Sequence, residues 1–322
     1  MRFPFELSSQ KDFDVVGFGT NAVDFLIAVP EYPKFNSKVE LKNYFQLAGG
    51  EVASTMVGLS RLGMKTAYVG RFGNDAAGNF GIKTLIDEGV NTEFAEIVEG
   101  ARTQIAFIII DERSGERTII WKRDDKLSYK PEEVPLEIAE KCKILHVTPH
   151  DTKACCTMAK RAKSSGAIVS LDIDNLFEGV EDLLKFVDVF ISSEEFQLKF
   201  LGIADQKTAL REIKLRYGCK VVGATLGSKG SLILCEDKFI KTESFSVPGG
   251  CKDTTGAGDA FRAGFLYGIL TNQTVEVAAK LANAVAALKC RQIGARTALP
   301  KKDELMSFLH SRGINQLENL RS

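Results

Sequence analysis

A carboxylate follows a short run of small residues between positions 252 and 261, where the sequence reads KDTTGAGDAF. Apolar side chains then recur at helical spacing, which predicts a helix that begins close to Gly258 or Asp259. At a helix N-terminus, free backbone N–H groups and the positive end of the helix dipole attract anions such as phosphate. The small residues that would let an anion approach this backbone are Gly256, Ala257 and Gly258.

Asp259 has two interpretations. A carboxylate in the first turn stabilises a helix by about 0.3–1 kcal/mol, whatever the function. Phosphoryl transfer also requires an anion hole followed by an acid: the amides stabilise charge on the phosphoryl oxygens, and the acid accepts a proton from the attacking hydroxyl. A capping acid alone does not need the three small residues before it, so the sequence favours phosphoryl transfer with Asp259 as general base.

The rest of the chain predicts the elements that position this site. Short β-branched runs such as FDVVGFG, TAYVGRF and AIVSLDI alternate with amphipathic segments such as ASTMVGLSRL and TKACCTMAKRAKSS. This alternation predicts an α/β fold, with a mostly parallel sheet and helices on both faces. Residues 22–48 and 103–122 read as strands without a helix, and the second region has a turn near Ser114 and Gly115. We expect a single domain over residues 1–322 with a small antiparallel β lid.

Composition limits the partners. The 42 Lys and Arg residues balance 42 Asp and Glu residues, so no charge excess argues for a nucleic-acid or membrane partner. Seven cysteines without a CxxC pair, beside three histidines, do not predict a zinc site or a disulfide framework. The N-terminus has no apolar core of signal-peptide length, and no run of about 18 apolar residues occurs. We therefore expect a cytoplasmic protein.

The stretch GFGTNA at 17–22 matches the start of a dinucleotide-binding fingerprint. Such a fingerprint must open a helix, because the pyrophosphate binds at the helix N-terminus. The next residues, DFLIAVPEYP, contain two prolines and an apolar run better suited to a strand. Dinucleotide binding is therefore not expected.

Several motifs together resemble the ribokinase-like (PfkB) family of sugar kinases over about residues 14–310. DTTGAGDAF resembles the C-terminal signature of the family, and AGGEVASTMVGLSRLGMKTAYVGRFGNDAAG, TLGSKGS, LANAVAALKC and GARTALP occur in the family's order. The stretches VAALKC and LDID are most similar to ketose-type members such as sulfofructose kinase. The resemblance implies a ribokinase-like Rossmann-type fold and an ATP- and Mg²⁺-dependent kinase. Its substrate would be a primary hydroxyl of a small sugar of ketohexose or pentose type.

The resemblance also implies roles for particular residues. Asp259 corresponds to the catalytic base, and the amides of Gly256, Ala257 and Gly258 to the anion hole. The positions matching the sugar site are Asp24, Gly49, Gly50 and Ser54, with Asp174 at a strand end that faces the cleft. The positions matching the nucleotide side are Thr225, Gly227, Gly230 and Asn283.

Some of these roles have alternatives. Asp24 could be a solvated acid at a strand end, Asp174 a helix cap, and Asn283 a surface residue of its helix. The family commonly has Asn where this chain has Ser54, whose shorter side chain cannot offer both a donor and an acceptor arm to one hydroxyl. The identity of the sugar is therefore left open.

Two regions of the chain concern metal ions. The NxxE element of the family, linked to the metal and phosphates, does not align at 193–196, where Glu194 and Glu195 lie one or two places away. We take Glu195 as the candidate acid and keep Glu194 as its alternative. Asp253 and Thr255 lie where many relatives hold a monovalent cation, so the resemblance implies a K⁺ that shapes the anion-hole loop.

Two other functions remain open. One is a nucleoside kinase of the same fold. The other is a sugar- or nucleotide-binding regulator with weak catalysis, which the altered NxxE element suggests and the intact GAGD opposes.

The lid raises the question of assembly. Its segment RTIIWKRD carries Arg117, Trp121, Lys122 and Arg123, of which at least two should face solvent because strand side chains alternate. The run IAFIII is too apolar to leave a sheet face in water. Since lids of relatives often pack against each other, we expect a homodimer through the lids.

Overall fold

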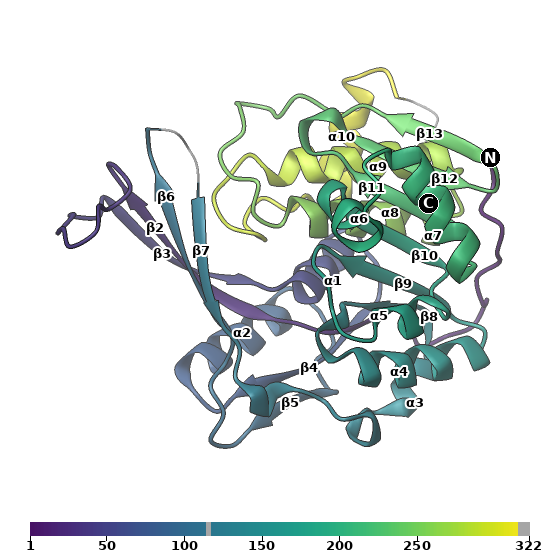
Figure 1. Ribbon diagram of the computed structural model, residues 1–322, viewed down its shortest axis with the longest axis horizontal. Coiled ribbons are helices and arrows are strands. Elements are labelled where there is room, and N and C mark those ends of the chain that lie inside the picture. Colours follow the sequence, from purple (N-terminus) through teal and green to yellow (C-terminus); the bar gives the residue numbers. More distant parts are fainter. Residues whose placement is uncertain (114–116, 315–322) are drawn as a thin grey trace.

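The protein is described by a computed structural model that covers residues 1–113 and 117–314. Within these residues the strands form a nine-stranded sheet and a separate four-stranded sheet (Figure 1). The spatial order of the large sheet is β13 (Lys238–Thr242), β12 (Ser231–Cys235), β11 (Val221–Thr225), β10 (Val189–Ser193), β9 (Ile168–Ile173), β8 (Cys142–Val147), β1 (Phe13–Phe18), β4 (Thr66–Gly73) and β5 (Ala95–Val98). Its pairs are parallel from β11 to β5 and antiparallel from β11 to β13, which confirms the predicted fold class.

Helices cover both faces of the large sheet. One face carries α1 (Glu51–Arg61), α2 (Ala76–Asp87), α8 (Ala257–Leu270), α9 (Val275–Lys289) and α10 (Lys302–His310). The other carries α3 (Leu136–Glu140), α4 (Thr152–Ser164), α5 (Val180–Leu184), α6 (Glu194–Leu201) and α7 (Gln206–Tyr217). Strand alternation supplies both layers, since Val15 packs on the first face and Val16 on the second. In the part of the chain that is described, none of these helices has the length and apolar character to span a membrane.

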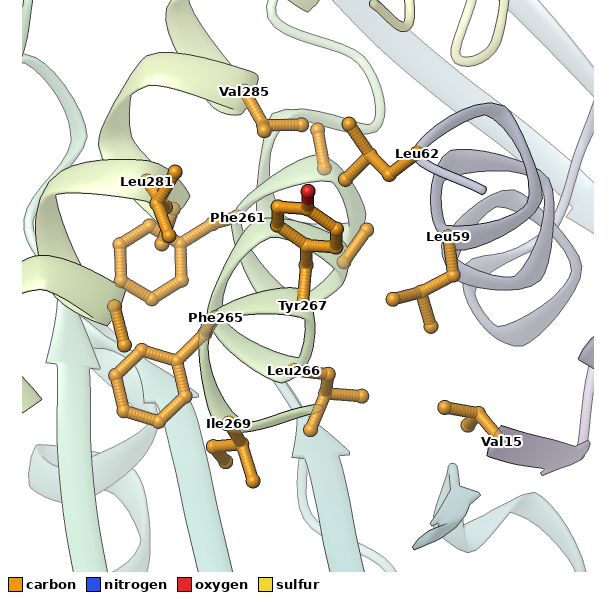
Figure 2. Close-up of a cluster of buried hydrophobic side chains, with 14 of the residues drawn as sticks. Val15, Leu59, Leu62, Phe261, Phe265, Leu266, Tyr267, Ile269, Leu281 and Val285 are labelled. Carbon is orange, nitrogen blue, oxygen red and sulfur yellow. The ribbon is translucent and has the colours of Figure 1, made fainter. Parts of the chain in front are cut away.

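Helix α8 lies inside the first layer, where its large apolar side chains pack against α1, α9 and β1 (Figure 2). Gly268 allows α9 to approach closely, because a Cβ there would lie 2.5 Å from the Cβ of Ala278. The helix begins at Ala257, within two residues of the predicted start. Its N-terminus is thus carried by a buried helix with little room to shift.

The second sheet is the predicted lid, which stands away from the body (Figure 1). Its strands, in spatial order, are β3 (Asn43–Gly49), β2 (Ala22–Val29), β6 (Ile105–Asp111) and β7 (Arg117–Lys122). The pairs β2–β3 and β6–β7 are antiparallel hairpins, while β2 and β6 run parallel where the hairpins meet. The predicted turn near Ser114 and Gly115 lies outside the described residues.

The lid has two distinct faces. On one face, Asp24 of β2 stands in register with Ala106 of β6 and Trp121 of β7. The opposite face is apolar, and the ring of Phe25 stacks on that of Phe107 with centroids 5.3 Å apart. The large apolar residues of this apolar lid face are Phe25, Ile27, Tyr44, Phe107, Ile109 and Ile120, and the polar residues Gln46, Thr118 and Lys122 share the face with them.

The four polar and aromatic residues of the segment RTIIWKRD lie along β7 and directly after it. Arg117, Trp121 and Lys122 are exposed, as expected for at least two of the four, but all six residues of β7 are exposed, so the predicted alternation is not the cause. Arg117 and Trp121 border the cavity beneath the lid. Arg123 is half-buried, and its Nη2 donates to Oδ2 of Asp151 at 2.8 Å.

Candidate active site

A cavity of about 660 Å³ lies between the lid and the carboxyl ends of the central strands. Asp24 and Trp121 line it from the lid, while Ser193 and Thr225 line it from the last residues of β10 and β11. The N-terminus of α8 forms a further part of its wall through Gly256 and Asp259. Ligands of open α/β sheets bind at this edge, so the cavity is the candidate active site.

The structure brings half of the predicted site residues together in this cavity. Those that line it are Asp24, Gly50, Asp174, Thr225, Thr255, Gly256, Gly258 and Asp259. The others lie beneath or beside the cavity: Gly49, Ser54, Asp253, Ala257, Gly227, Gly230, Asn283 and Glu195.

The N-terminus of α8 is open toward the cavity. Gly256 is its N-cap residue with φ 74°, and within the described chain no side chain accepts a hydrogen bond there. The amide of Ala257 donates to the carbonyl of Thr254 at 3.0 Å, so this predicted anion-hole amide is already bonded inside the loop. Gly256 and Gly258 are the two predicted anion-hole residues that line the cavity.

Asp259 shares this wall with a buried ion pair. Arg262, one turn further along α8, places Nη2 2.5 Å from Oδ1 of Asp172 and 3.1 Å from the carbonyl of Ile191. Burial raises the pKa of Asp259 to about 6, the Arg262 charge opposes this rise, and the carboxylate of Asp174 adds to it. Asp259, the candidate base, is therefore ionised at neutral pH, and its pKa lies only slightly below that pH.

Glu51, which was not among the residues predicted from the sequence, also lines the cavity. Its carboxylate accepts a hydrogen bond from Oγ1 of Thr20 at 3.0 Å and lies 3.7 Å from Nδ1 of His150. Burial raises its pKa well above the usual value, and the charges of Asp172, Asp174 and Asp259 raise it further. Glu51 directly follows the two glycines of the AGGEVAS motif, which is the signal that could have identified it.

Asp24 is only 6% exposed, so the alternative of a solvated strand-end acid is wrong. Burial raises its pKa to about 6, and the nearby Arg296 guanidinium opposes the rise. A Cβ on Gly49 would lie 2.1 Å from Oδ2 of Asp24, which explains why glycine stands there.

Arg296, in the GARTALP motif, donates to the carbonyl of Gly49 and to Oγ of Ser54 at 3.2 Å. Ser54 is thus buried beneath the cavity, where it holds Arg296.

On the nucleotide side, Thr225 is followed by a short 3₁₀ turn at Gly227–Lys229. Gly230 has φ 90°, and a Cβ on it would lie 2.0 Å from the carbonyl oxygen of Thr242. Asn283 is buried, and its Nδ2 donates to Oγ of Ser231 at 2.9 Å, so the alternative of a surface residue is wrong. Asn283 supports β12 from below the cavity.

The candidate metal-linked acids are both outside the cavity. The side chain of Glu195 is 81% exposed and lies 3.7 Å from Lys199, its neighbour one turn along α6. Glu194 lies 4.0 Å from Lys229. Among the described residues, no group of three His, Cys, Asp or Glu side chains is arranged to hold a metal. Magnesium commonly binds substrate phosphates and water with only one or two carboxylates, so such a cage is not required.

Asp253 lies at the base of the loop that leads into α8. Its Oδ1 accepts from the amide and the hydroxyl of Thr255 at 2.8 and 2.7 Å, and its Oδ2 from the amide of Gly294 at 2.8 Å. Nζ of Lys289 donates to the Asp253 carbonyl at 2.8 Å and lies 3.8 Å from Oδ2. Burial favours a high pKa for Asp253, but the Lys289 charge and these hydrogen bonds hold it below the usual value.

Comparison with known proteins decides the family. The model of the pfkB family of carbohydrate kinases matches residues 12–302. The chain belongs to this family. The kinase is 33% identical to an uncharacterized sugar kinase of Archaeoglobus fulgidus over 76% of this chain and 99% of that one. It is 30% identical to the probable fructokinase-3 of Arabidopsis thaliana, over 94% and 93% of the two chains.

The fold comparison agrees. The structure of Arabidopsis thaliana ribokinase complexed with ribose and ATP superimposes with a TM-score of 0.82 and 25% identity, over 92% of this kinase and 98% of that chain. The resemblance predicted from the motifs, a PfkB carbohydrate kinase with a ribokinase-like fold, is therefore confirmed.

Gly256 provides the first test of the site. Gly256→Ala would place a Cβ 2.8 Å from the Cβ of Ala295 at a positive φ, so the loop must shift. We expect kcat to fall at least about tenfold, since a displacement near 1 Å at a reacting site can cost about 10²-fold. Steady-state kinetics with ATP and a sugar would measure the effect.

Gly250→Ala is the matched control. Gly250 also has a positive φ, 85°, but nothing lies within 4 Å of its Cβ position. The Gly250→Ala variant should lose only the stability that backbone strain costs, roughly 1–2 kcal/mol, and its kcat should stay close to that of the wild type. Equal losses of kcat in both variants would contradict a specific role for Gly256.

Proposed function

We propose that this kinase transfers the γ-phosphate of ATP to a primary hydroxyl of a small, uncharged sugar of ketohexose or pentose type. The observation that carries the proposal is the shared cavity: Asp259 stands beside the uncapped N-terminus of α8, and Asp24 faces the same space from the lid. A hydroxyl held at Asp24 and a phosphoryl group held at Gly256 and Gly258 would meet near Asp259.

The proposed mechanism assigns each group one task. Asp259 accepts the proton of the attacking hydroxyl, which its pKa of about 6 allows at neutral pH. The amides of Gly256 and Gly258 stabilise the charge that develops on the phosphoryl oxygens. Arg262 neutralises Asp172, which lines the same cavity, so that one carboxylate fewer repels the phosphate. Asp24 orients the sugar through its hydroxyls.

The cofactors follow from the cavity and its relatives. Ribokinase of Arabidopsis thaliana binds ribose and ATP, and Thr225 lines this cavity on the side assigned to the nucleotide. Mg²⁺ prefers oxygen ligands and keeps several waters. Asp174, Asp259 and the hydroxyl of Ser193 offer such oxygens in the cavity, whereas Glu195 would have to reorient to reach it. When bound, the ion supplies positive charge to the phosphates.

The charge of the cavity favours an uncharged sugar. The carboxylates of Asp24, Glu51, Asp174 and Asp259 line it. Two guanidinium groups also line it: that of Arg262 is paired with Asp172, and that of Arg117 donates from Nη1 to Oγ1 of Thr254 at 2.7 Å. The carboxylates therefore outnumber the guanidinium groups. An anionic substituent on the sugar would meet these carboxylates and lose binding free energy.

A substrate panel tests the proposal. We expect ATP consumption, measured by a coupled assay, to be highest with an uncharged ketohexose or pentose and low with sugar phosphates and sulfonates. If adenosine outperforms every sugar, the kinase is a nucleoside kinase of the same fold. If ATP is consumed with none of the acceptors, the chain acts as a binding protein and the proposal is wrong.

Asp259→Asn tests the general base. We expect it to retain the fold and the affinity for ATP while kcat falls by about 10²–10⁴-fold, the usual contribution of a positioned base. Asp205→Asn is the matched control, because Asp205 caps α7 by accepting from the amide of Thr208 at 3.0 Å and does not line the cavity. If Asp259 were only a helix cap, both variants would lose a little stability and keep their kcat.

The pH profile gives a second readout of the same role. Because the ionised form of Asp259 accepts the proton and its pKa is about 6, kcat/KM of the wild type should fall as the pH drops through this value. Asp174→Asn removes a charge that raises this pKa, so the acid limb should move to lower pH.

The apolar lid face supports a second proposal, that two copies pair through their lids. Tyr44, Phe107 and Ile120 are exposed on this face in the single chain, together with partly covered neighbours. A second copy would cover the same apolar surface on both chains, as isologous dimers do.

Analytical sedimentation tests this pairing. We expect about twice the 35.3 kDa chain mass at micromolar concentration, through an interface of at least about 1,000 Å². Phe107→Asp should produce a monomer, whereas Leu215→Asp, at an exposed position of α7 distant from the lid, should remain a dimer. A wild type that sediments as a monomer with and without sugar would rule the dimer out.

A further inference from the structure

Lys289, the last residue of α9, is completely buried. Lysine is almost never fully buried unless its charge is paired, because removing an ammonium group from water is unfavourable. Within the described residues its one charged partner is Asp253, whose carboxylate lies 3.8 Å away and whose carbonyl oxygen accepts a hydrogen bond at 2.8 Å. The side chain is therefore directed to a single loop.

That loop leads directly into the anion hole. Asp253 holds Thr255 through two hydrogen bonds, and Gly256 follows as the N-cap of α8. The other oxygen of Asp253 binds the amide of Gly294, whose neighbour Ala295 packs against Gly256. Lys289 thus lies behind the loop and holds Asp253, which in turn connects the two segments that shape the phosphate site, residues 253–256 and 294–295.

We propose that the Lys289 ammonium is the resident cation of this loop, so that the kinase works without the monovalent cation expected at Asp253 and Thr255. The proposal rests on the proposed function, since the loop matters to catalysis only if Gly256 and Gly258 bind the phosphoryl group. Lys289 is a positioning residue, because it acts through Asp253 and lies beneath the cavity.

The contacts of Asp253 do not favour a bound K⁺. Both of its carboxylate oxygens already accept hydrogen bonds from Thr255 and Gly294. A cation placed beside them would also meet the Lys289 ammonium, and like charges repel strongly where water is excluded. The lysine supplies the same charge and, through its N–H groups, binds the backbone carbonyl that a cation would otherwise attract.

The wild-type protein provides the first measurement. Its kcat should change less than about twofold when K⁺ is replaced by Na⁺ or by bulky tetramethylammonium at constant ionic strength, because none of these ions is needed. A several-fold loss of kcat in tetramethylammonium would overturn the proposal. This series needs no variant, so it decides the question even if a Lys289 variant fails to fold.

Two variants test the lysine itself. Lys289→Met keeps the length without the charge and should lower kcat by about 10-fold to 10²-fold, the scale expected for a displaced reacting group. Lys289→Ala leaves room for an ion, so its kcat should rise at least about fivefold when K⁺ or methylammonium is added, an increase that the wild type does not show. Full activity of Lys289→Met without added cations would overturn the proposal.

The melting temperature of the protein without substrates gives a readout independent of activity. K⁺ should raise the melting temperature of Lys289→Ala relative to tetramethylammonium, because an ion that binds only the folded state stabilises it. Lys163→Ala is the matched control, since Lys163 pairs with the buried Asp188 at 2.6 Å far from the loop. It should lose stability but gain no response to K⁺.

The Asp259→Asn variant distinguishes a failure of the proposed role of Lys289 from a failure of the proposed function. If Asp259→Asn is inactive and Lys289→Met is fully active, only the role of Lys289 is wrong. If Asp259→Asn is fully active, the proposed function itself fails.

Discussion

An anion-binding helix end is useful only if the protein does not cap it, and much of this structure follows from that constraint. The first turn of α8 leaves amide groups directed toward the cavity, a state that loses free energy unless a ligand or water binds them. The end must also stay in place when the ligand is absent. Close packing of α8 against α9 fixes it from behind, and Asp253 and Ala295 fix the preceding loop from the side.

The charges of the site are arranged around this helix end. Burial raises the pKa values of Asp24, Glu51 and Asp259, and nearby carboxylates raise them further. Buried guanidinium groups limit this effect: Arg296 lies near Asp24, and Arg262, which lines the cavity, pairs with Asp172. The site thus combines carboxylates whose pKa values are raised with guanidinium groups that lie close to them.

The sequence predicted this site where the information was local. The α8 N-terminus could be predicted because apolar periodicity and a glycine run lie side by side in the chain, and the lid because two strand patterns lack helices. Glu195 could not be placed, because one residue of shift in a helix start turns a side chain by about 100°. Lys289 and Arg296 acquire their roles from residues 36 and 247 positions away, which no local pattern reveals.

The parallel pairing of β2 with β6 has a mechanical consequence. It joins two hairpins from separate parts of the chain into one four-stranded sheet. Neither hairpin can therefore move alone without breaking the hydrogen bonds between β2 and β6. Hydrogen bonds next to the strands tie this sheet to the body: Nδ2 of Asn21 donates to the hydroxyl of Tyr68 at 2.7 Å, and Oγ1 of Thr103 donates to Oδ1 of Asp75 at 2.7 Å. Arg296 adds a third contact at the carbonyl of Gly49 in β3. A hinge motion of the lid would therefore carry Asp24 and Trp121 together, so that a ligand bound to one strand of this sheet changes the position of the other strands as well.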